Sequence, residues 1–272
     1  MDAVSLVATP RSAGATERRG AIAQEIQHRG RATVAELSRQ FGVSQVSVRQ
    51  DLARLERAGL VKRVRGGARA VSDGAHIPSF DVRLLQGVAV KQAIGRAASE
   101  LIHPGDIVFL DAGTTVLEVA RSIPRPLLES GNLTVVTRSA MILSHLRGRR
   151  RTRLIVLGGV YVPDFDDFVG EEVENALRAI RVDTLFIGTD GLSLERGVTT
   201  DNVLETGLYR LMARCAKRLV LVTDSGKIGR DQFQVILPLD AVDTLITDDG
   251  APPDFAKALR ARGMQVILVP RP

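Results

Sequence analysis

Tryptophan is absent from these 272 residues, tyrosine occurs twice, and cysteine occurs once, at Cys215. A single cysteine excludes an internal disulfide and any metal site built from a cysteine cluster. Cys215 lies within the segment 211–219, and we interpret it as a buried packing residue. The four histidines are scattered without the spacing of metal ligands, so we predict no metal and no cofactor.

Long apolar runs are also absent. No run reaches the roughly 18 residues that a membrane span needs, and the first residues lack the basic start and apolar core of a secretory signal. We therefore expect no membrane association and a cytoplasmic location. The hydrophobic share of 44% and charged share of 25% are ordinary for a globular protein, and the length allows one full domain plus a small one.

A polar helix near the N-terminus organises the rest of the chain. Ser44 can cap its start, because a serine oxygen accepts an N–H group of the first turn, and Gly59 suits its end. Val48, Leu52 and Leu55 recur at the spacing of one helical face. Its polar faces carry Gln45, Ser47, Arg49, Gln50 and Arg54.

These polar side chains are of the types that read base edges or bind phosphates in DNA. We therefore predict a DNA recognition helix whose DNA-binding residues include Ser44, Gln45, Ser47, Arg49, Gln50 and Arg54. A surface helix with a solvated polar face is the alternative, and the flanking sequence decides between them.

The flanking segments predict a winged helix-turn-helix. Thr33 and Glu36 have the spacing of a capping box, which starts a helix, and a short turn at Gly42 separates that helix from the next. The periodic segment 18–28 supplies a third helix. Two short β-prone pieces around Gly66 predict a hairpin, the wing. Cations on this wing are Lys62, Arg63, Arg65 and Arg69, of which we assign Lys62, Arg63 and Arg65 to DNA binding.

Charge is distributed unevenly along the chain. Residues 17–71 hold 12 lysines and arginines against 5 acidic residues, a balance of +7, whereas the whole chain carries +6. Residues 1–16 are neutral in sum, so residues 72–272 sum to −1. This concentration is typical of a surface that displaces counterions from a phosphate backbone, which makes double-stranded DNA the expected partner.

The composition suggests four segments: a loose tail over 1–16, the winged helix-turn-helix over 17–71, a linker over 72–85 and a sensor domain over 86–272. In the last segment, short apolar strands such as 107–110 and 184–187 alternate with helices. That alternation predicts an α/β fold with a parallel sheet covered on both faces.

Several predicted strands end in loops with ligand-binding chemistry. In parallel sheets, ligands bind just outside the carboxyl ends of the strands. Gly and Thr at a helix start offer N–H groups to an anion, glycines admit close backbone approach, and lysine supplies a charge. The sequence therefore predicts a pocket for a phosphorylated polar molecule. Its expected lining residues are Asp111, Gly113, Thr114, Thr115, Gly158, Gly191 and Lys227.

The motifs of both halves resemble those of the DeoR/GlpR family of bacterial transcription regulators. The resemblance rests on the segments 35–37, 43–44, 48–52 and 65–68 of the first half and on the segments 111–115, 157–159, 188–191 and 224–227 of the second half. It covers roughly residues 18–250. It implies a sensor domain similar in fold to ribose-5-phosphate isomerase and CoA transferases, with the strand-end residues above, apart from Gly158, lining the effector site.

Three positions depart from the family pattern. Where the family usually has the second arginine of Arg-Arg-Asp-Leu, this chain has Gln50. Where the family usually has asparagine after the threonine at 137, this chain has Arg138, and where it usually has lysine, this chain has Tyr209. The first change affects which operator is preferred. The other two add a guanidinium and remove an amine, which redistributes charge around the effector.

We therefore expect a repressor of carbohydrate genes that binds operator DNA as a homo-oligomer, a dimer or a tetramer, and responds to a phosphorylated sugar. The alternative is a sugar-phosphate isomerase or CoA-transferase-like enzyme with an accessory DNA-binding module. Such an enzyme needs a carboxylate base or nucleophile, for which the candidates are Glu171, Glu172 and Glu205.

Overall fold

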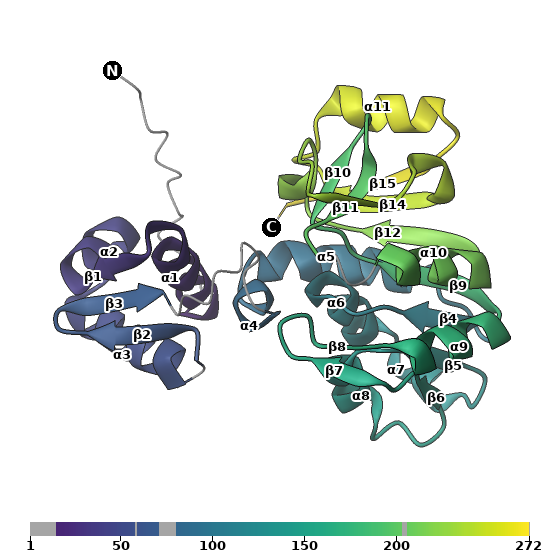
Figure 1. The fold of residues 1–272 in the computed structure, drawn as a ribbon, viewed down its shortest axis with the longest axis horizontal. Helices are drawn as coiled ribbons and strands as arrows, with labels where there is room; N and C mark the ends of the chain where they lie inside the picture. The colour runs from purple at the N-terminus through teal and green to yellow at the C-terminus, as the bar shows by residue number, and fades with distance from the viewer. Residues whose placement is uncertain (1–14, 58, 71–79, 203–205, 272) are drawn as a thin grey trace. The chain divides into compact units, whose positions relative to one another are not determined.

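The computed structural model describes residues 15–57, 59–70, 80–202 and 206–271. The chain divides into two compact units, Met1–Val88 and Ala89–Pro272, which are coloured from purple to blue and from blue to yellow in Figure 1. Residues 1–14 of the expected tail, residue 71 of the expected winged helix-turn-helix and residues 72–79 of the expected linker lie outside the described residues.

The first unit contains the predicted three helices and hairpin, with one additional strand and one additional helix. Its elements are α1 (Ala15–Arg29), β1 (Arg31–Thr33), α2 (Val34–Phe41), α3 (Gln45–Arg57), β2 (Val61–Val64), β3 (Gly67–Ala70) and α4 (Phe80–Leu84).

Local chemistry starts and ends these helices as predicted. The capping box is confirmed: the Glu36 N–H donates to the Thr33 hydroxyl over 3.2 Å, and the Thr33 N–H donates to the Glu36 carboxylate over 2.7 Å. Ser44 caps α3 by accepting the Ser47 N–H over 3.1 Å. Gly42 ends α2 with φ of 64°, a left-handed conformation that costs glycine little.

The wing is a three-stranded antiparallel sheet in the order β1-β3-β2, whereas the sequence predicted only a hairpin. The strand β1 has three residues, too few for a periodic pattern. Gly67 of β3 permits the pairing of β1 with β3, because a Cβ there would collide with the Ala32 carbonyl. The core beneath the sheet consists of fully buried residues from all three predicted helices, with Ile22, Ile26, Leu37, Val48, Leu52 and Leu55 at its centre.

The expected linker 72–85 contains a short helix in its last third. Val82 on α4 is fully buried and belongs to the core cluster of the first unit, and Leu85 packs against that cluster. Gly20 on α1 makes room for this contact, because a side chain there would collide with the Leu85 backbone. The segment 80–85 is therefore folded onto the first unit.

The second unit confirms the predicted parallel sheet. Seven strands lie in the order β15-β14-β12-β9-β4-β5-β6, and every neighbouring pair is parallel. The strands are β4 (Ile107–Leu110), β5 (Thr134–Thr137), β6 (Arg153–Val156), β9 (Val182–Ile187), β12 (Ala216–Val222), β14 (Thr244–Asp248) and β15 (Gln265–Val269). The helices are α5 (Val88–Ser99), α6 (Thr114–Ser122), α7 (Arg125–Glu129), α8 (Ala140–Leu146), α9 (Glu171–Ala179), α10 (Thr206–Cys215) and α11 (Pro253–Ala261), with short 3-10 turns η1 (Ser225–Lys227) and η2 (Leu239–Ala241).

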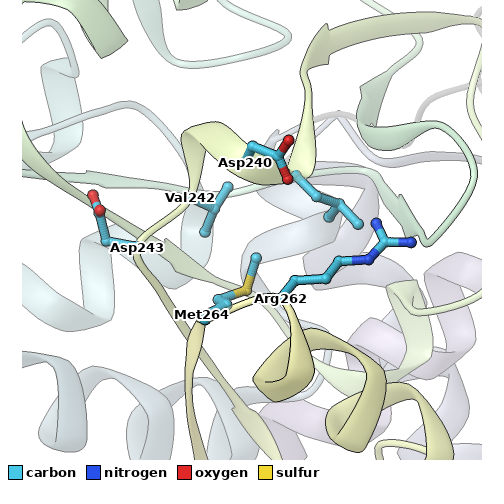
Figure 2. A pocket seen from close by; sticks show the side chains of 7 residues that line it. Asp240, Val242, Asp243, Arg262 and Met264 are labelled. Atoms are coloured by element: carbon cyan, nitrogen blue, oxygen red, sulfur yellow. The ribbon is translucent and has the colours of Figure 1, made fainter.

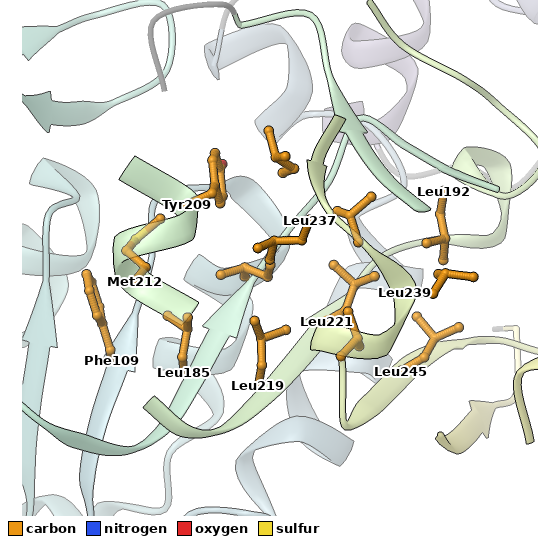
Figure 3. Packing of buried hydrophobic residues seen from close by; sticks show 14 of the residues in the cluster. Phe109, Leu185, Leu192, Tyr209, Met212, Leu219, Leu221, Leu237, Leu239 and Leu245 are labelled. Atoms are coloured by element: carbon orange, nitrogen blue, oxygen red, sulfur yellow. The ribbon is translucent and has the colours of Figure 1, made fainter. Parts of the chain in front are cut away.

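Consecutive residues are buried along the central strands: all five residues of β14 and the last four of β9 and β12. Because successive side chains of a strand point to opposite faces, the sheet is covered on both sides, as expected. Figure 3 shows the core on one face, where Phe109, Leu185 and Leu219 of the sheet lie near Tyr209 and Met212 of α10. Cys215 belongs to the same cluster, and burial raises the pKa of its thiol.

Two antiparallel additions were not predicted. The strands β10 (Gly191–Ser193), β11 (Gly197–Thr200) and β13 (Gln234–Leu237) form a small sheet, and β7 (Val160–Val162) and β8 (Asp167–Val169) form a hairpin. The three-residue strands β7, β8 and β10 carry too few side chains for a clear alternation. Their positions matter for function, because both additions follow directly on strand ends of the parallel sheet.

Candidate functional site

The exposed face of α3 carries the predicted DNA-binding side chains. Gln45, Arg49, Gln50 and Arg54 are all exposed. The Arg49 guanidinium donates to the Gln45 side-chain oxygen over 3.3 Å, which holds both side chains on the same face. Of the two predicted serines, Ser44 serves as the cap, with its hydroxyl 3.0 Å from that of half-buried Ser47.

A buried acid fixes α3 to the rest of the unit. The side chain of Asp51 is 4% exposed; it accepts a hydrogen bond from Arg18 over 2.8 Å and lies 3.8 Å from Arg19. Both arginines belong to α1. The Ser38 hydroxyl donates to the Val43 carbonyl over 2.6 Å and closes the turn between α2 and α3. Sequence reasoning included Asp51 only in a motif; its ion pairs come from tertiary packing.

The wing separates its cations into two groups. Arg63 pairs with Glu56 of α3: its backbone N–H donates to that carboxylate over 2.9 Å, and its guanidinium lies 3.8 Å away. Arg63 thus ties the wing to α3, and its charge is partly offset. Lys62 and Arg65 form the second group: both are exposed, and neither forms an ion pair with another described residue.

Across the three strands, Arg31 is paired with Arg69, and Arg69 with Lys62. All three side chains are exposed, so the outer face of the wing carries a row of three cations. Like charges directly opposite in a sheet are destabilising. A row of this kind is favourable when an anion such as a phosphate backbone covers it. Arg31 was not a candidate from the sequence, because only the pairing of β1 brings it beside Arg69.

In the second unit the predicted site residues all lie at the carboxyl edge of the parallel sheet. Asp111–Thr115 follow β4, Gly158 follows β6, Gly191 follows β9 and Lys227 follows β12. Between β6 and β12 stand β5, β4 and β9. Four strand spacings amount to roughly 19 Å, so one monosaccharide phosphate does not reach both Gly158 and Lys227. The compact part of the site is the loop after β4 with its two neighbours.

The loop after β4 leads into a helix whose start has no side-chain cap. Gly113 precedes α6 with φ of 140°, a conformation that favours glycine, and no side chain caps the helix. The N–H groups at the start of α6 therefore have no side-chain cap, and they lie beside Thr114 and Thr115, each 8% exposed.

Asp111 does not line an open surface. It is fully buried, and the Arg138 guanidinium donates to it over 2.6 Å and to Asp167 over 2.8 Å. The guanidinium carbon also lies 5.9 Å from the centre of the Tyr209 ring. The two departures from the family pattern, Arg138 and Tyr209, are therefore in contact, which the sequence did not indicate.

The hairpin β7–β8 covers this cluster. The Phe168 N–H donates to the Arg138 carbonyl over 2.9 Å, and the Ser139 hydroxyl donates to Asp166 over 2.7 Å. Asp166 has φ of 61°, which is uncommon for a residue other than glycine. The hairpin is thus fastened to the end of β5 by adjacent residues, and Arg138 is sealed beneath it.

The glycines of the site have different roles. A Cβ at Gly191 would collide with the Arg230 carbonyl, so this glycine is explained by packing inside the protein. At exposed Gly158 an added Cβ would meet nothing within 4 Å. The sequence suggested that Gly158 lets a ligand approach the backbone closely. The close approach in the structure is at Gly159 and is made by the protein itself, because a Cβ there would collide with the Val169 carbonyl.

The turn that carries Lys227 rests on a buried acid. Asp248 accepts hydrogen bonds from the Ser225 N–H over 2.6 Å, the Ser225 hydroxyl over 2.7 Å and Arg271 over 2.6 Å. Burial alone would raise the pKa of Asp248, but these bonds outweigh it and hold the pKa below its ordinary value. Gly250 makes room for the guanidinium, because a Cβ there would collide with it. Arg271 was not a candidate from the sequence.

A separate pocket of about 250 Å³ lies at the opposite edge of the sheet. Figure 2 shows Asp240, Val242, Asp243, Arg262 and Met264 around it. These residues precede β14 and β15, so the pocket is at the amino ends of the strands and outside the predicted site. Within the described ranges, no three His, Cys, Asp or Glu side chains gather as a metal site, and no helix could span a membrane.

A helix-turn-helix unit with an exposed cationic face, joined to an α/β unit with ligand-type loops at its strand ends, defines a ligand-responsive DNA-binding regulator. Comparison with known proteins agrees. Residues 18–73 match the DeoR-like helix-turn-helix domain, and residues 86–249 match the DeoR C terminal sensor domain. The chain belongs to the DeoR family of transcriptional regulators, and it is a regulator rather than an enzyme.

Its relatives match over almost their whole length. A putative aga operon transcriptional repressor of Escherichia coli O157:H7 is 36% identical over 95% of this chain and 96% of its own. The regulator GlpR of Haloferax volcanii is 32% identical over 92% of this chain and 96% of its own. The repressor GlcR of Bacillus subtilis is 31% identical over 93% of this chain and 95% of its own. A ribose 5-phosphate isomerase structure from Methanocaldococcus jannaschii is 16% identical, covers 51% of this chain and 53% of its own, and has a TM-score of 0.37.

Three glutamates were the expected catalytic candidates of the alternative enzyme hypothesis. Glu171 and Glu172 are exposed in the first turn of α9. Glu205 lies outside the described residues.

Proposed function

We propose that this regulator represses genes of carbohydrate metabolism and that a phosphorylated sugar, bound at the strand-end loops, changes its affinity for operator DNA. The names of two relatives, a putative aga operon repressor and the repressor GlcR, support the direction of regulation. We further propose that it acts in the cytoplasm as a homo-oligomer. DNA binding by residues 17–71 and sensing by 86–272 are part of this proposal.

The observation that carries the proposal is the exposed face of α3 beside the cationic wing. Arg49, Gln50 and Arg54 would enter the major groove, and Lys62 and Arg65 would contact phosphates. A helix-turn-helix dimer binds two half-sites about one helical turn apart, so a second copy of the chain would double this surface.

At the sensor site, the phosphate would be held by the N–H groups and hydroxyls of Thr114 and Thr115. Asp111 would act from beneath as a positioning residue, because Arg138 stands between its carboxylate and the surface. Arg138, Asp111 and Asp167 have a formal charge of −1 in sum, so the phosphate would lie at the start of α6, away from this cluster, and the hydroxyl groups of the sugar would lie nearer to it. Lys227 would be reached only by a ligand that extends toward β12.

Effector and operator are coupled when the effector binds one arrangement of the oligomer more tightly than the other. The shift in operator affinity cannot exceed that difference in effector affinity. An effector at 100 times its Kd would add about 2.7 kcal/mol of stability, which makes a thermal-shift screen of pentose and hexose phosphates a direct way to identify it.

The proposal is tested by fluorescence anisotropy with the gene's own upstream duplex and a scrambled duplex of equal length. We expect the upstream duplex to bind more tightly and the sugar phosphate found in the screen to weaken that binding. Thr114→Val should bind DNA normally and lose the response, whereas Thr134→Val, at the amino end of β5, should keep it. Equal binding to both duplexes, with and without sugar phosphates, would refute the proposal.

A further inference from the structure

The first turn of α3 exposes one large apolar side chain among polar ones. Val46 is 60% exposed, although valine is among the residues most often buried. Its neighbours in sequence, Gln45 and Ser47, are polar. A β-branched residue also has no advantage on a solvated helix surface, because its propensity there is lower than that of alanine.

Val46 lies at the centre of the exposed face. Residues three and four positions apart are neighbours on a helix surface, so Val46 adjoins Arg49 and Gln50. Leu55, nine positions later, points in the opposite direction and is 1% exposed in the core. The apolar side chain is therefore surrounded by the same groups that would contact bases.

The major groove presents one apolar group, the C5-methyl of thymine. Recognition helices approach base edges with their N-terminal residues, and Val46 is the second residue of α3. Valine in a helix is held mostly in one rotamer, so little side-chain freedom is lost when it makes a contact.

We propose that Val46 reads the C5-methyl group of a thymine in each operator half-site. This inference rests on the proposed function, and it adds an apolar contact to the polar ones of Arg49 and Gln50. It makes the presence of a methyl group, rather than a hydrogen-bonding pattern, the feature recognised at that base pair.

The test uses deoxyuridine, which differs from thymidine only in lacking this methyl group. The operator is first selected from random duplexes with the wild-type protein, and each of its thymines is then replaced singly. We expect about a fourfold loss of affinity at one thymine per half-site, the effect of exposing one buried methyl-sized group. Val46→Ala should bind the thymine operator more weakly and show no further loss with deoxyuridine at that position.

Val160→Ala is the matched control, because Val160 is 66% exposed and belongs to the sensor unit. It should reproduce the wild-type profile. An equal loss at the same thymine for wild type and Val46→Ala, or no sensitive thymine at all, would overturn the methyl contact while leaving the regulator intact. If the wild-type protein selected no sequence, operator recognition itself would fail, and this contact with it.

Discussion

Each of the two units buries an ion cluster, and the two clusters have opposite composition. In the first unit one acid, Asp51, lies between two arginines whose side chains are 20% and 16% exposed. In the second unit one arginine, Arg138, lies between two acids, and no member is more than 1% exposed. Water can hydrate the two arginines of the first cluster. The charges of the second cluster are stabilised only by protein groups.

This difference matches what each unit would bind. The first cluster has a formal positive charge in sum and lies beneath α3, the helix proposed to contact DNA. The second carries a net negative charge at an edge where hydroxyl groups would be recognised. In each unit the buried charge also fixes a functional element: Asp51 orients α3, and Arg138 fastens the loop after β4 to the hairpin β7–β8.

The largest effect should come from Arg138→Met, because it leaves two buried carboxylates without their shared cation. Breaking a buried ion pair in this way costs about 3–5 kcal/mol. Both tyrosines belong to the second unit and the chain has no tryptophan, so tyrosine fluorescence during urea denaturation follows that unit. Exposed Arg153→Met is the control; a loss as small as that of the control would contradict the importance of the cluster.

A smaller effect is expected for Asp51→Asn, since both arginines remain partly hydrated. Hydrogen bonds to charged groups are worth about 1.5–3 kcal/mol, and asparagine keeps the volume and one acceptor, so we expect about 1–2 kcal/mol. Operator affinity should fall as well, because α3 loses its anchor to α1. Far-UV circular dichroism follows unfolding, and Glu56→Gln, at the exposed wing contact, is the comparison. Unchanged operator binding would show that α3 is held by its apolar face alone.

Arg69→Gln should change stability and DNA binding in opposite directions. Removing the middle cation relieves like-charge repulsion of about 0.2–1 kcal/mol at low salt, so the melting temperature should rise. The slope of DNA affinity against salt should fall by about one phosphate contact. Arg29→Gln is the matched control, because Arg29 pairs with Glu25 of the same helix. A lower melting temperature together with an unaltered slope would remove the outer face of the wing from the DNA interface.

The smallest effect concerns pH. Because the folded-state pKa of Asp248 lies below its ordinary value near 3.8, its contribution is complete above that value and is lost as pH falls through the folded pKa. Arg271→Gln removes one cause of the low pKa, so unfolding of the second unit should begin at a higher pH. Tyrosine fluorescence during acid titration measures this, with exposed Arg147→Gln as control. If Arg271→Gln and the control unfolded at the same pH, the two hydrogen bonds from Ser225 would be enough to keep the pKa of Asp248 low.

The winged helix-turn-helix could be predicted because its signals are local. The Thr33–Glu36 capping box, the cap at Ser44 and the spacing of Val48, Leu52 and Leu55 each lie within a few residues of one another. The parallel sheet was predictable for a related reason: strands buried on both faces are continuous apolar runs. The strands β1, β7, β8, β10, β11 and β13 were missed, and four of them, β1, β7, β8 and β10, have only three residues, too few for such a pattern.

Sequence alone determined which segments become helices or buried strands, and where the positive charge is concentrated, because capping, periodicity and composition act over short distances. Tertiary structure decided which distant charges meet. It placed Arg31 beside Arg69, Arg138 between Asp111 and Asp167, and Arg271 on Asp248. For the buried groups Arg138 and Asp248, the physical reason is that a charge taken out of water needs a partner within a few ångströms, and only the packed fold specifies which partner is there. For exposed Arg31 and Arg69, the pairing of β1 with β3 decides which side chains are neighbours.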